Sequence, residues 1–136
     1  DDRFNTMTVS WGGVGELWNK DVAFLFVRPQ RYTYQFIENN DYFTLSFFGG
    51  EYKKELGICG SRSGRDIDKM EATGLTPVNI GESTGFKEAK ITVYMKKLAY
   101  QDMKPDGFID DSIMNNYKEN DFHRVYVGEI IKVIVE

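Results

Sequence analysis

The chain has 136 residues, 41% of them hydrophobic and 15% aromatic, which suits one domain with a single core over residues 1–136. Its 17 basic and 21 acidic residues give a net charge of −4, and this argues against a nucleic-acid-binding surface, because such surfaces carry a basic excess. No apolar run approaches the roughly 18–20 residues of a membrane span. The single cysteine excludes an intrachain disulfide and favours a reducing compartment, so we expect a cytoplasmic protein.

The first half of the chain predicts short strands interrupted by short helices. Residues 7–11 have the β-branched character of a strand, which the glycines at 12, 13 and 15 are expected to end. The unbroken apolar run 22–27 predicts a strand buried on both faces. A helix is expected over 31–40, and the alternation in 42–48 predicts a half-buried strand.

Two further helices are predicted in the middle of the chain. Apolar residues spaced i, i+4, i+7 indicate one over 51–59. The second is expected over 65–74, with Ser63 and Asp66 as a capping arrangement at its start and Gly74 as its stop.

The second half of the chain is mostly β in character. Residues 89–100 and 124–136 alternate apolar and polar side chains, and Gly128 within the second run indicates a bulge or a close backbone approach. A turn with one helical turn is expected over 105–118. The sum is about six strands with two or three short helices, which predicts a mainly β antiparallel barrel with helical insertions rather than a doubly wound sheet.

Motifs for several common chemistries are missing from the sequence. The glycine cluster at 12–15 fails the dinucleotide fingerprint, because Trp18 stands where the third glycine belongs. One histidine and one cysteine cannot form a zinc cluster, and no nucleophile elbow accompanies His123. Cys59 falls on an apolar helix face and is expected to be packed. A protein poor in its own reactive groups often takes its chemistry from a cofactor.

Two segments combine arginines with hydroxyls and glycines at helix starts. They are "RPQRYT", residues 28–33, and "CGSRSGRD", residues 59–66. Guanidinium groups, backbone N–H groups and hydroxyls together suit an anionic ligand such as a phosphate. The alternative is that both segments are solvated loops, and that "NTMT" is a strand with a polar outer face.

Four segments in order resemble one protein family. They are "RFNTMTVSWGGVGELWNK", "FVRPQRYTYQFIENNDYFTLSFF", "CGSRSGRDIDK" and "DFHRVYVGEI". Together they resemble the flavin reductase-like, FMN-binding split-barrel family, and in particular its flavoredoxin-like branch. The resemblance implies a six-stranded antiparallel split barrel with helical insertions, one further strand before the first residue, and a homodimer with FMN near the subunit interface.

The resemblance also implies roles for individual residues. The isoalloxazine ring would lie along Asn5, Thr6, Met7, Thr8, Ser10 and Trp11. The phosphate and ribityl chain would be held by Arg28, Gln30, Arg31, Tyr32 and Thr33. The phosphate side would be closed by Cys59, Gly60, Ser61, Ser63, Arg65, Asp66 and Lys69.

His123 corresponds to a position where reductases of this family often carry an Asp-His pair. Here Phe122 precedes it and Asp121 lies one residue further back. This departure leaves two readings open for His123: a residue on the nicotinamide side, or a structural or interface residue. No residue is predicted to be catalytic in its own right, and no metal site is expected.

The function expected from the resemblance is FMN-binding redox chemistry, with two-electron transfer at flavin N5. One form is an NAD(P)H-dependent flavin reductase, with NAD(P)H as co-substrate. The other is a flavoredoxin-like electron carrier with a partner protein. The alternatives are a non-enzymatic barrel that has lost flavin or holds another anionic ligand, and, more distantly, an oxidase of the pyridoxine-phosphate type.

Overall fold

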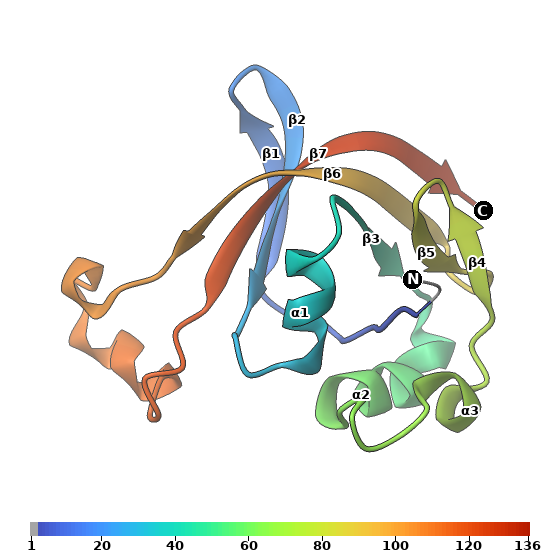
Figure 1. The fold of residues 1–136 in the computed structure, drawn as a ribbon, viewed down its shortest axis with the longest axis horizontal. Coiled ribbons are helices and arrows are strands. Elements are labelled where there is room, and N and C mark those ends of the chain that lie inside the picture. Colours follow the sequence, from blue (N-terminus) through green and yellow to red (C-terminus); the bar gives the residue numbers. More distant parts are fainter. Residues whose placement is uncertain (1–2) are drawn as a thin grey trace.

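The computed structural model describes residues 3–136, and its main feature is an antiparallel sheet in the order β1-β2-β7-β6-β3. The strands of this sheet are β1 (Gly12–Leu17), β2 (Lys20–Val27), β3 (Tyr42–Phe47), β6 (Ile91–Asp102) and β7 (Arg124–Val135). β6 and β7 pair along almost their whole length and form the arch across Figure 1. Every neighbouring pair is antiparallel, as expected where no regular helical crossovers separate the strands.

One face of the sheet carries the core. The predicted strand is confirmed. Its burial on both faces holds at Val22 and Ala23, which are fully buried, whereas Phe24 and Phe26 on the Val22 face are half-buried. α1 (Tyr32–Glu38) lies against the inner face, below the arch in Figure 1. The buried cluster there consists of Ala23, Leu25, Val27, Ile37, Phe43, Val93, Met95 and Tyr126. Gly128 belongs to this face, because a Cβ on it would come within 2.9 Å of Phe43 Cζ, so the predicted close approach is confirmed.

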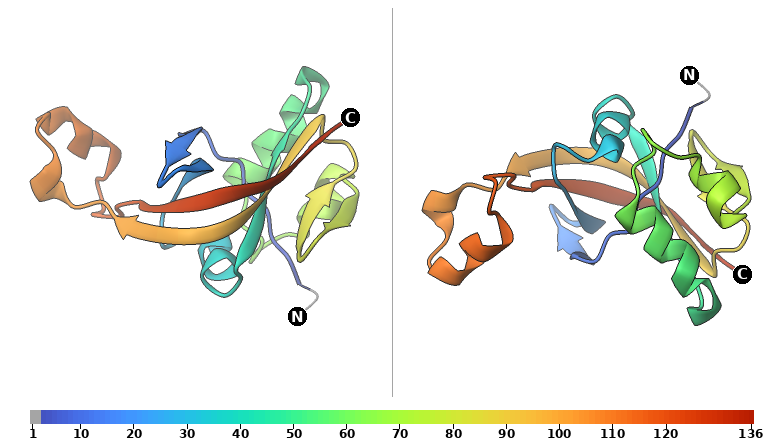
Figure 2. Two further views of the ribbon diagram at one scale, coloured as in Figure 1. Left: turned by 90° about the horizontal axis from the view of Figure 1, so that it is seen from above. Right: turned by 90° about the horizontal axis from the view of Figure 1, so that it is seen from below.

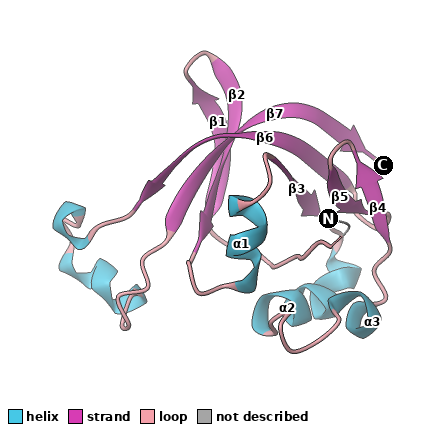
Figure 3. Ribbon diagram, viewed as in Figure 1, coloured by secondary structure: helices cyan, strands magenta, loops and turns pink. Residues whose placement is uncertain are grey.

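A smaller layer lies beside the main sheet. The short helix η1 (Gly50–Tyr52) leads into α2 (Lys53–Ser61), and α3 (Lys69–Thr73) follows; α2 and α3 lie together in Figure 3. The β4 (Pro77–Ile80) and β5 (Ser83–Phe86) hairpin completes the layer. Cys59, Leu75 and Phe86 form the buried cluster of this part of the molecule.

The far ends of β6 and β7 extend into a segment that projects from the body, visible in both views of Figure 2. We call residues 103–123 the arm. It contains two short 3-10 helices, η2 (Pro105–Gly107) and η3 (Asp111–Asn116). No helix in the described part of the chain has the length and apolar character needed to cross a membrane.

The structure corrects the predicted strand over 7–11. These residues are extended but pair with no strand, and the glycines begin β1 rather than end a strand. The turn falls instead at Trp18 and Asn19, whose φ angles of 56° and 58° match a two-residue hairpin turn. Gly12 allows β1 to approach β2 closely, because a Cβ on it would come within 2.5 Å of the Phe24 carbonyl oxygen.

Other boundaries also differ from the predictions. α3 begins at Lys69 and is capped by Asp68, whose carboxylate accepts from the N–H groups of Met70 and Glu71, so the predicted Ser63–Asp66 cap is wrong. Gly74 ends the helix with φ 74°, as predicted. The β4–β5 hairpin was not predicted. The count of six strands and a closed barrel are not confirmed, since residues 3–136 form one sheet of five strands and one of two.

Candidate functional site

The segment before β1 crosses the inner side of the molecule in extended form (Figure 2). Residues 4–9 are half-buried, yet the backbone N–H groups of residues 4–10 donate to no protein acceptor in the part of the chain that the structure describes. Half-buried backbone donors without partners are costly, and proteins pair them with protein, water or ligand. This segment therefore presents a row of donors to whatever lies beside it.

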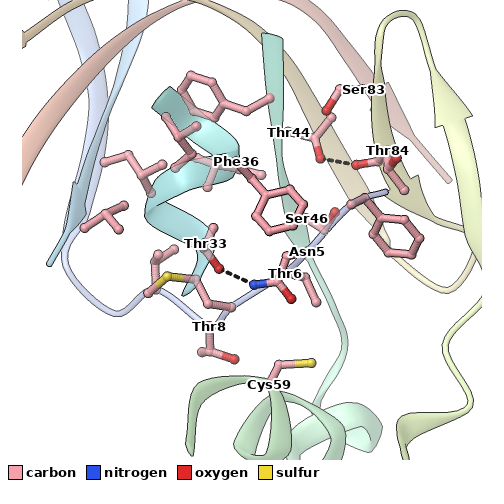
Figure 4. Close-up of a pocket in the computed structure, with 18 of the residues that line it drawn as sticks. Asn5, Thr6, Thr8, Thr33, Phe36, Thr44, Ser46, Cys59, Ser83 and Thr84 are labelled. Atoms are coloured by element: carbon pink, nitrogen blue, oxygen red, sulfur yellow. Dashed lines mark hydrogen bonds between the residues drawn. The ribbon is translucent and has the colours of Figure 1, made fainter. Parts of the chain in front are cut away.

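Cavities flank this segment. The larger one has a volume of about 970 Å³ and lies between the segment, α1, β3 and the β4–β5 hairpin. Figure 4 shows hydroxyl groups and aromatic rings on its walls, with Cys59 at its base. Asn5 Nδ2 donates to Thr33 Oγ1 at 2.8 Å, and Thr44 Oγ1 donates to the Thr84 carbonyl at 2.6 Å, so part of this polar lining is already paired.

The smaller cavity, of about 230 Å³, lies at the carboxyl end of β2. Met7, Thr8, Val9, Ser10 and Trp11 line it, as they also line the larger cavity. Its remaining wall is different in character and consists of Phe26, Arg28, Arg31 and His123. Of these two cavities, the smaller one places arginines of the predicted phosphate segment beside the predicted ring segment.

Arg31 and Lys69 meet at the carboxyl end of α2. Arg31 Nη2 donates to the Gly60 carbonyl at 3.2 Å, and Lys69 Nζ donates to the Cys59 carbonyl at 2.9 Å and the Thr6 carbonyl at 2.6 Å. Lys69 is only 5% exposed, and neither cation has a carboxylate partner among the described residues.

The pKa values of both groups reflect this surplus of positive charge. Burial, and then the charge of Arg28, lower the pKa of Arg31. Burial also lowers the pKa of Lys69; the Cys59 thiol opposes this shift, and the charge of Arg31 adds to it. Buried cations without a counter-ion favour the binding of an anion.

Arg28 and Gln30 are occupied differently from Arg31. Arg28 Nη1 forms an ion pair with Asp121 Oδ2, and Gln30 Nε2 donates to the same oxygen at 2.8 Å. Arg28 Nη2 also donates to the Asn116 carbonyl at 2.9 Å. These hydrogen bonds join the arm to the wall of the smaller cavity. The hydrogen bond from Arg28 is also the main cause of the lowered pKa of Asp121.

The 60–66 turn packs tightly against the ring segment. A Cβ on Gly64 would come within 2.3 Å of Asn5 Oδ1, and one on Gly60 within 3.1 Å of Thr8 Cβ. Ser61 Oγ donates to the Gly57 carbonyl, and Ser63 Oγ accepts from the Arg65 N–H.

Of the two side chains at the end of this turn, Arg65 contacts the 28–33 segment and Asp66 is exposed to solvent. Arg65 Nη1 donates to the Gln30 carbonyl at 3.1 Å, with its guanidinium 4.9 Å from the centre of the Tyr32 ring. The structure thus brings the three predicted segments together, although the Asp66 side chain is exposed.

Cys59 contributes its backbone rather than its thiol. Its side chain is 3% exposed and packs with Leu75 and Phe86, and burial raises the pKa of the thiol. The prediction of a packed cysteine is confirmed. Among the described residues, no group of three His, Cys, Asp or Glu side chains is placed to hold a metal ion.

The fold has several counterparts among solved structures. Flavoredoxin of Desulfovibrio vulgaris (Miyazaki F) superposes with a TM-score of 0.74 over 97% of this chain and 62% of its own, at 22% identity. The FMN-binding protein from Thermus thermophilus, solved with bound 1-cyclohex-2-enone, has a TM-score of 0.77 over 100% of this chain and 65% of its own, at 20% identity. The NADH:FAD oxidoreductase of Streptomyces globisporus C-1027 has a TM-score of 0.72 over 96% and 67%, at 13% identity.

The chain has the fold of the flavin reductase-like, FMN-binding proteins. The resemblance drawn from the four sequence motifs is therefore confirmed for the fold. No protein-family model and no curated protein sequence matches the chain. The chain spans less than two thirds of the length of the flavoredoxin and of the FMN-binding protein.

Some residues that shape the site in this flavin reductase-like fold were not predicted. Tyr117 follows η3 and reaches His123, and Asp121 neutralises Arg28. Both come from the arm, where Tyr117 lies outside the four motifs and Asp121 opens the fourth one without any indication that it pairs with Arg28. Nothing in its sequence indicates that it folds back toward residues 28–30.

Proposed function

We propose that this protein is an FMN-binding redox protein of the flavin reductase-like family. The observation that carries the proposal is the pair Arg31 and Lys69, a half-buried and a buried cation that hydrogen-bond only to backbone carbonyls. Carbonyl oxygens at a helix end offset part of this charge, but a phosphate would offset it fully.

The residues around these cations fit the rest of FMN. The unpaired N–H groups of residues 4–10 offer donors to the polar edge of a flat ring. Gly60 and Gly64 allow the phosphate-side turn to lie against that segment. Trp11 and Phe26 offer apolar surface in the smaller cavity. Bound FMN would supply two-electron chemistry at N5, while the protein binds, orients and shields the ring.

The donor and acceptor of electrons belong to the proposal as alternatives. One is reduction by NAD(P)H, as the name of the Streptomyces oxidoreductase suggests for that enzyme. The other is exchange with a partner protein, in the manner of a carrier. Anaerobic mixing of the FMN-loaded protein with NADH and with NADPH separates them, because only the reductase is bleached rapidly by a nicotinamide. The homodimer also remains a proposal.

The first test compares FMN with riboflavin, which lacks the phosphate. We expect Arg31→Ala to weaken FMN binding roughly 10- to 100-fold and riboflavin binding much less, since one charge-assisted hydrogen bond contributes about 1.5–3 kcal/mol. Lys132→Ala is the matched control, because it removes an exposed positive charge from β7. Titration followed by flavin fluorescence measures all three proteins.

Two results would count against the proposal. If Arg31→Ala weakens both flavins equally, Arg31 does not hold a phosphate. If the wild-type protein binds neither flavin, the alternative of a barrel that has lost flavin, or that holds another anion, replaces the proposal.

A further inference from the structure

His123 is hydrogen-bonded to Tyr117, which lies six residues before it in the chain. His123 immediately precedes β7, and Tyr117 immediately follows η3. Tyr117 Oη lies 2.7 Å from His123 Nδ1, with the tyrosine 4% and the histidine 8% exposed. The Met103 N–H also donates to the His123 carbonyl at 3.0 Å, so the base of the arm fixes the backbone at this point.

Aromatic packing holds both rings in place. Tyr117 stacks on Phe108 with ring centres 5.9 Å apart and tilts against Phe122 at 5.0 Å. His123 lies between Trp11, at 5.2 Å, and the edge of Phe26, at 6.2 Å. Neither ring can turn without displacing several neighbours, so the hydrogen bond between them is geometrically fixed.

The hydroxyl proton of Tyr117 has two nearby acceptors, His123 Nδ1 and the Met103 sulfur at 3.6 Å. An imidazole nitrogen is a much stronger acceptor than a thioether, so we infer that the Tyr117 hydroxyl donates its hydrogen bond to an unprotonated Nδ1. The neutral ring then carries its own proton on Nε2. Nε2 has no hydrogen-bond partner among the described residues. The unpaired side-chain atoms that are fully buried there are Glu55 Oε2 and Asp121 Oδ1, and Nε2 is not one of them, so solvent can reach it.

The charges around His123 keep the ring neutral. Burial lowers the pKa of His123, the positive charge of Arg28 lowers it further, and Asp121 acts in the opposite direction. Arg31 adds a second positive charge to the wall of the same cavity. The Arg28 guanidinium also lies 5.1 Å from the centre of the Tyr117 ring, so Arg28 contacts the tyrosine whose hydroxyl is hydrogen-bonded to His123.

We propose that Tyr117 is a positioning residue, which holds His123 in the Nε2–H form so that this group donates to a carbonyl oxygen of a ligand in the smaller cavity. The carbonyl half of this inference rests on the proposed function. A suitable oxygen is present on the pyrimidine edge of a flavin and on the carboxamide of a nicotinamide. The tautomer half concerns the protein without ligand.

The sequence makes this proposal directly measurable, because His123 is the only histidine. Protein labelled with 15N-histidine gives one imidazole spin system, and its nitrogen shifts report the tautomer and the pKa. For the unligated wild-type protein at pH 7 we expect an unprotonated Nδ1 and a protonated Nε2. A proton found on Nδ1 would overturn the proposal without any variant being needed.

The variant Tyr117→Phe removes the hydroxyl and keeps the ring on which Arg28 stacks. We expect a mixture of tautomers and a higher pKa for His123, because the neutral form loses its hydrogen bond. Met103→Leu is the matched control, and it should leave both readouts unchanged, since the sulfur is not the acceptor. An unchanged tautomer and pKa in folded Tyr117→Phe, or a changed tautomer in Met103→Leu, would overturn the assignment.

The ligand is tested in two further steps on the wild-type protein. FMN is added first, and NAD⁺, which cannot reduce the flavin, is added next. A downfield shift of the Nε2 proton with FMN identifies the flavin carbonyl as the acceptor, and a shift only with NAD⁺ identifies the carboxamide. If FMN binds and neither addition moves this proton, the carbonyl half is wrong. If FMN does not bind, the proposed function fails, while the tautomer measurement still decides the role of Tyr117.

Discussion

Two clusters of charged side chains in this molecule differ in how their charges are balanced. In the first, Arg124 lies between Glu38, at 2.9 Å, and Asp102, at 2.6 and 3.0 Å. Tyr126 donates to the same oxygen of Glu38, and the Arg124 guanidinium stacks 4.0 Å from the centre of the Tyr100 ring. Every charge in this cluster has an opposite charge beside it.

The second cluster is formed by Arg31 and Lys69, and its positive charges have no carboxylate beside them in residues 3–136. The pKa shifts follow the same division. The hydrogen bond to Asp102 raises the pKa of Arg124, whereas burial lowers the pKa of Arg31 and of Lys69. The balanced cluster joins α1 to the main sheet. The unbalanced one is the site that we propose for the phosphate of FMN, and this difference can be tested.

The largest effect on stability is expected in the balanced cluster. Arg124→Met leaves Glu38 and Asp102 without their cation, and because both carboxylates are partly exposed we expect a loss of about 2 kcal/mol in the free energy of unfolding, mostly from the lost hydrogen bonds. Chemical denaturation followed by circular dichroism measures it. FMN affinity in the folded variant should stay within about twofold of wild type, because none of these side chains lines the smaller cavity. A stability change near zero would remove the contrast between the clusters.

A smaller effect on stability is expected for Lys69→Met. The substitution loses two hydrogen bonds to carbonyls but also removes a buried charge, so the free energy of unfolding without ligand should change by no more than about 1 kcal/mol. FMN affinity should fall less than in Arg31→Ala, because Lys69 lies behind the cavity wall and acts through the positive charge that it adds beside Arg31. A stability loss as large as that of Arg124→Met would mean that Lys69 serves only to cap α2.

The smallest expected effect is a difference in pH dependence. The folded-state pKa of His123 lies below its ordinary 6.5, so the unfolded chain takes up this proton first, and stability falls as the pH drops below about 6.5. Burial alone would raise the pKa of Glu38, but hydrogen bonds from Tyr126 and Arg124 outweigh it, so the stability that Glu38 contributes is lost only as the pH falls below its ordinary 4.5.

The unfolding midpoint in urea, measured from pH 7.5 to 4, should therefore decline in two separate ranges. His123→Asn is expected to flatten the range just below pH 6.5 and to leave the lower range in place. If this variant keeps the full slope below pH 6.5, the pH dependence arises from other groups.

Much of the fold follows from periodicity in the sequence. The apolar run 22–27 and the long alternating runs near the end identify β2, β6 and β7, because burial on a sheet imposes a period of two on the chain. The glycines at 12, 13 and 15 begin β1, whereas the sequence predicts that they end a strand. The hairpin turn forms at Trp18 and Asn19, which no local rule favours over a glycine pair.

The site was predictable to the extent that its residues lie in three motifs. The structure brings those three segments together, but local sequence could not show how individual groups are used. Arg28 and Arg31 look equivalent in "RPQRYT", yet Asp121 neutralises one of them and not the other. That distinction depends on Asp121 of the arm, which lies 93 residues after Arg28, and it can be found only from the fold.

The two tryptophans lie in different surroundings, and the fluorescence of one of them can report on the smaller cavity. Trp11 lies against His123 on the wall of the smaller cavity, whereas Trp18 is 58% exposed at the tip of the β1–β2 hairpin. Filling the cavity alters the surroundings of the first indole and leaves those of the second as they were. In Trp18→Phe, a change in ultraviolet emission reports on Trp11 alone, because this variant keeps no other tryptophan.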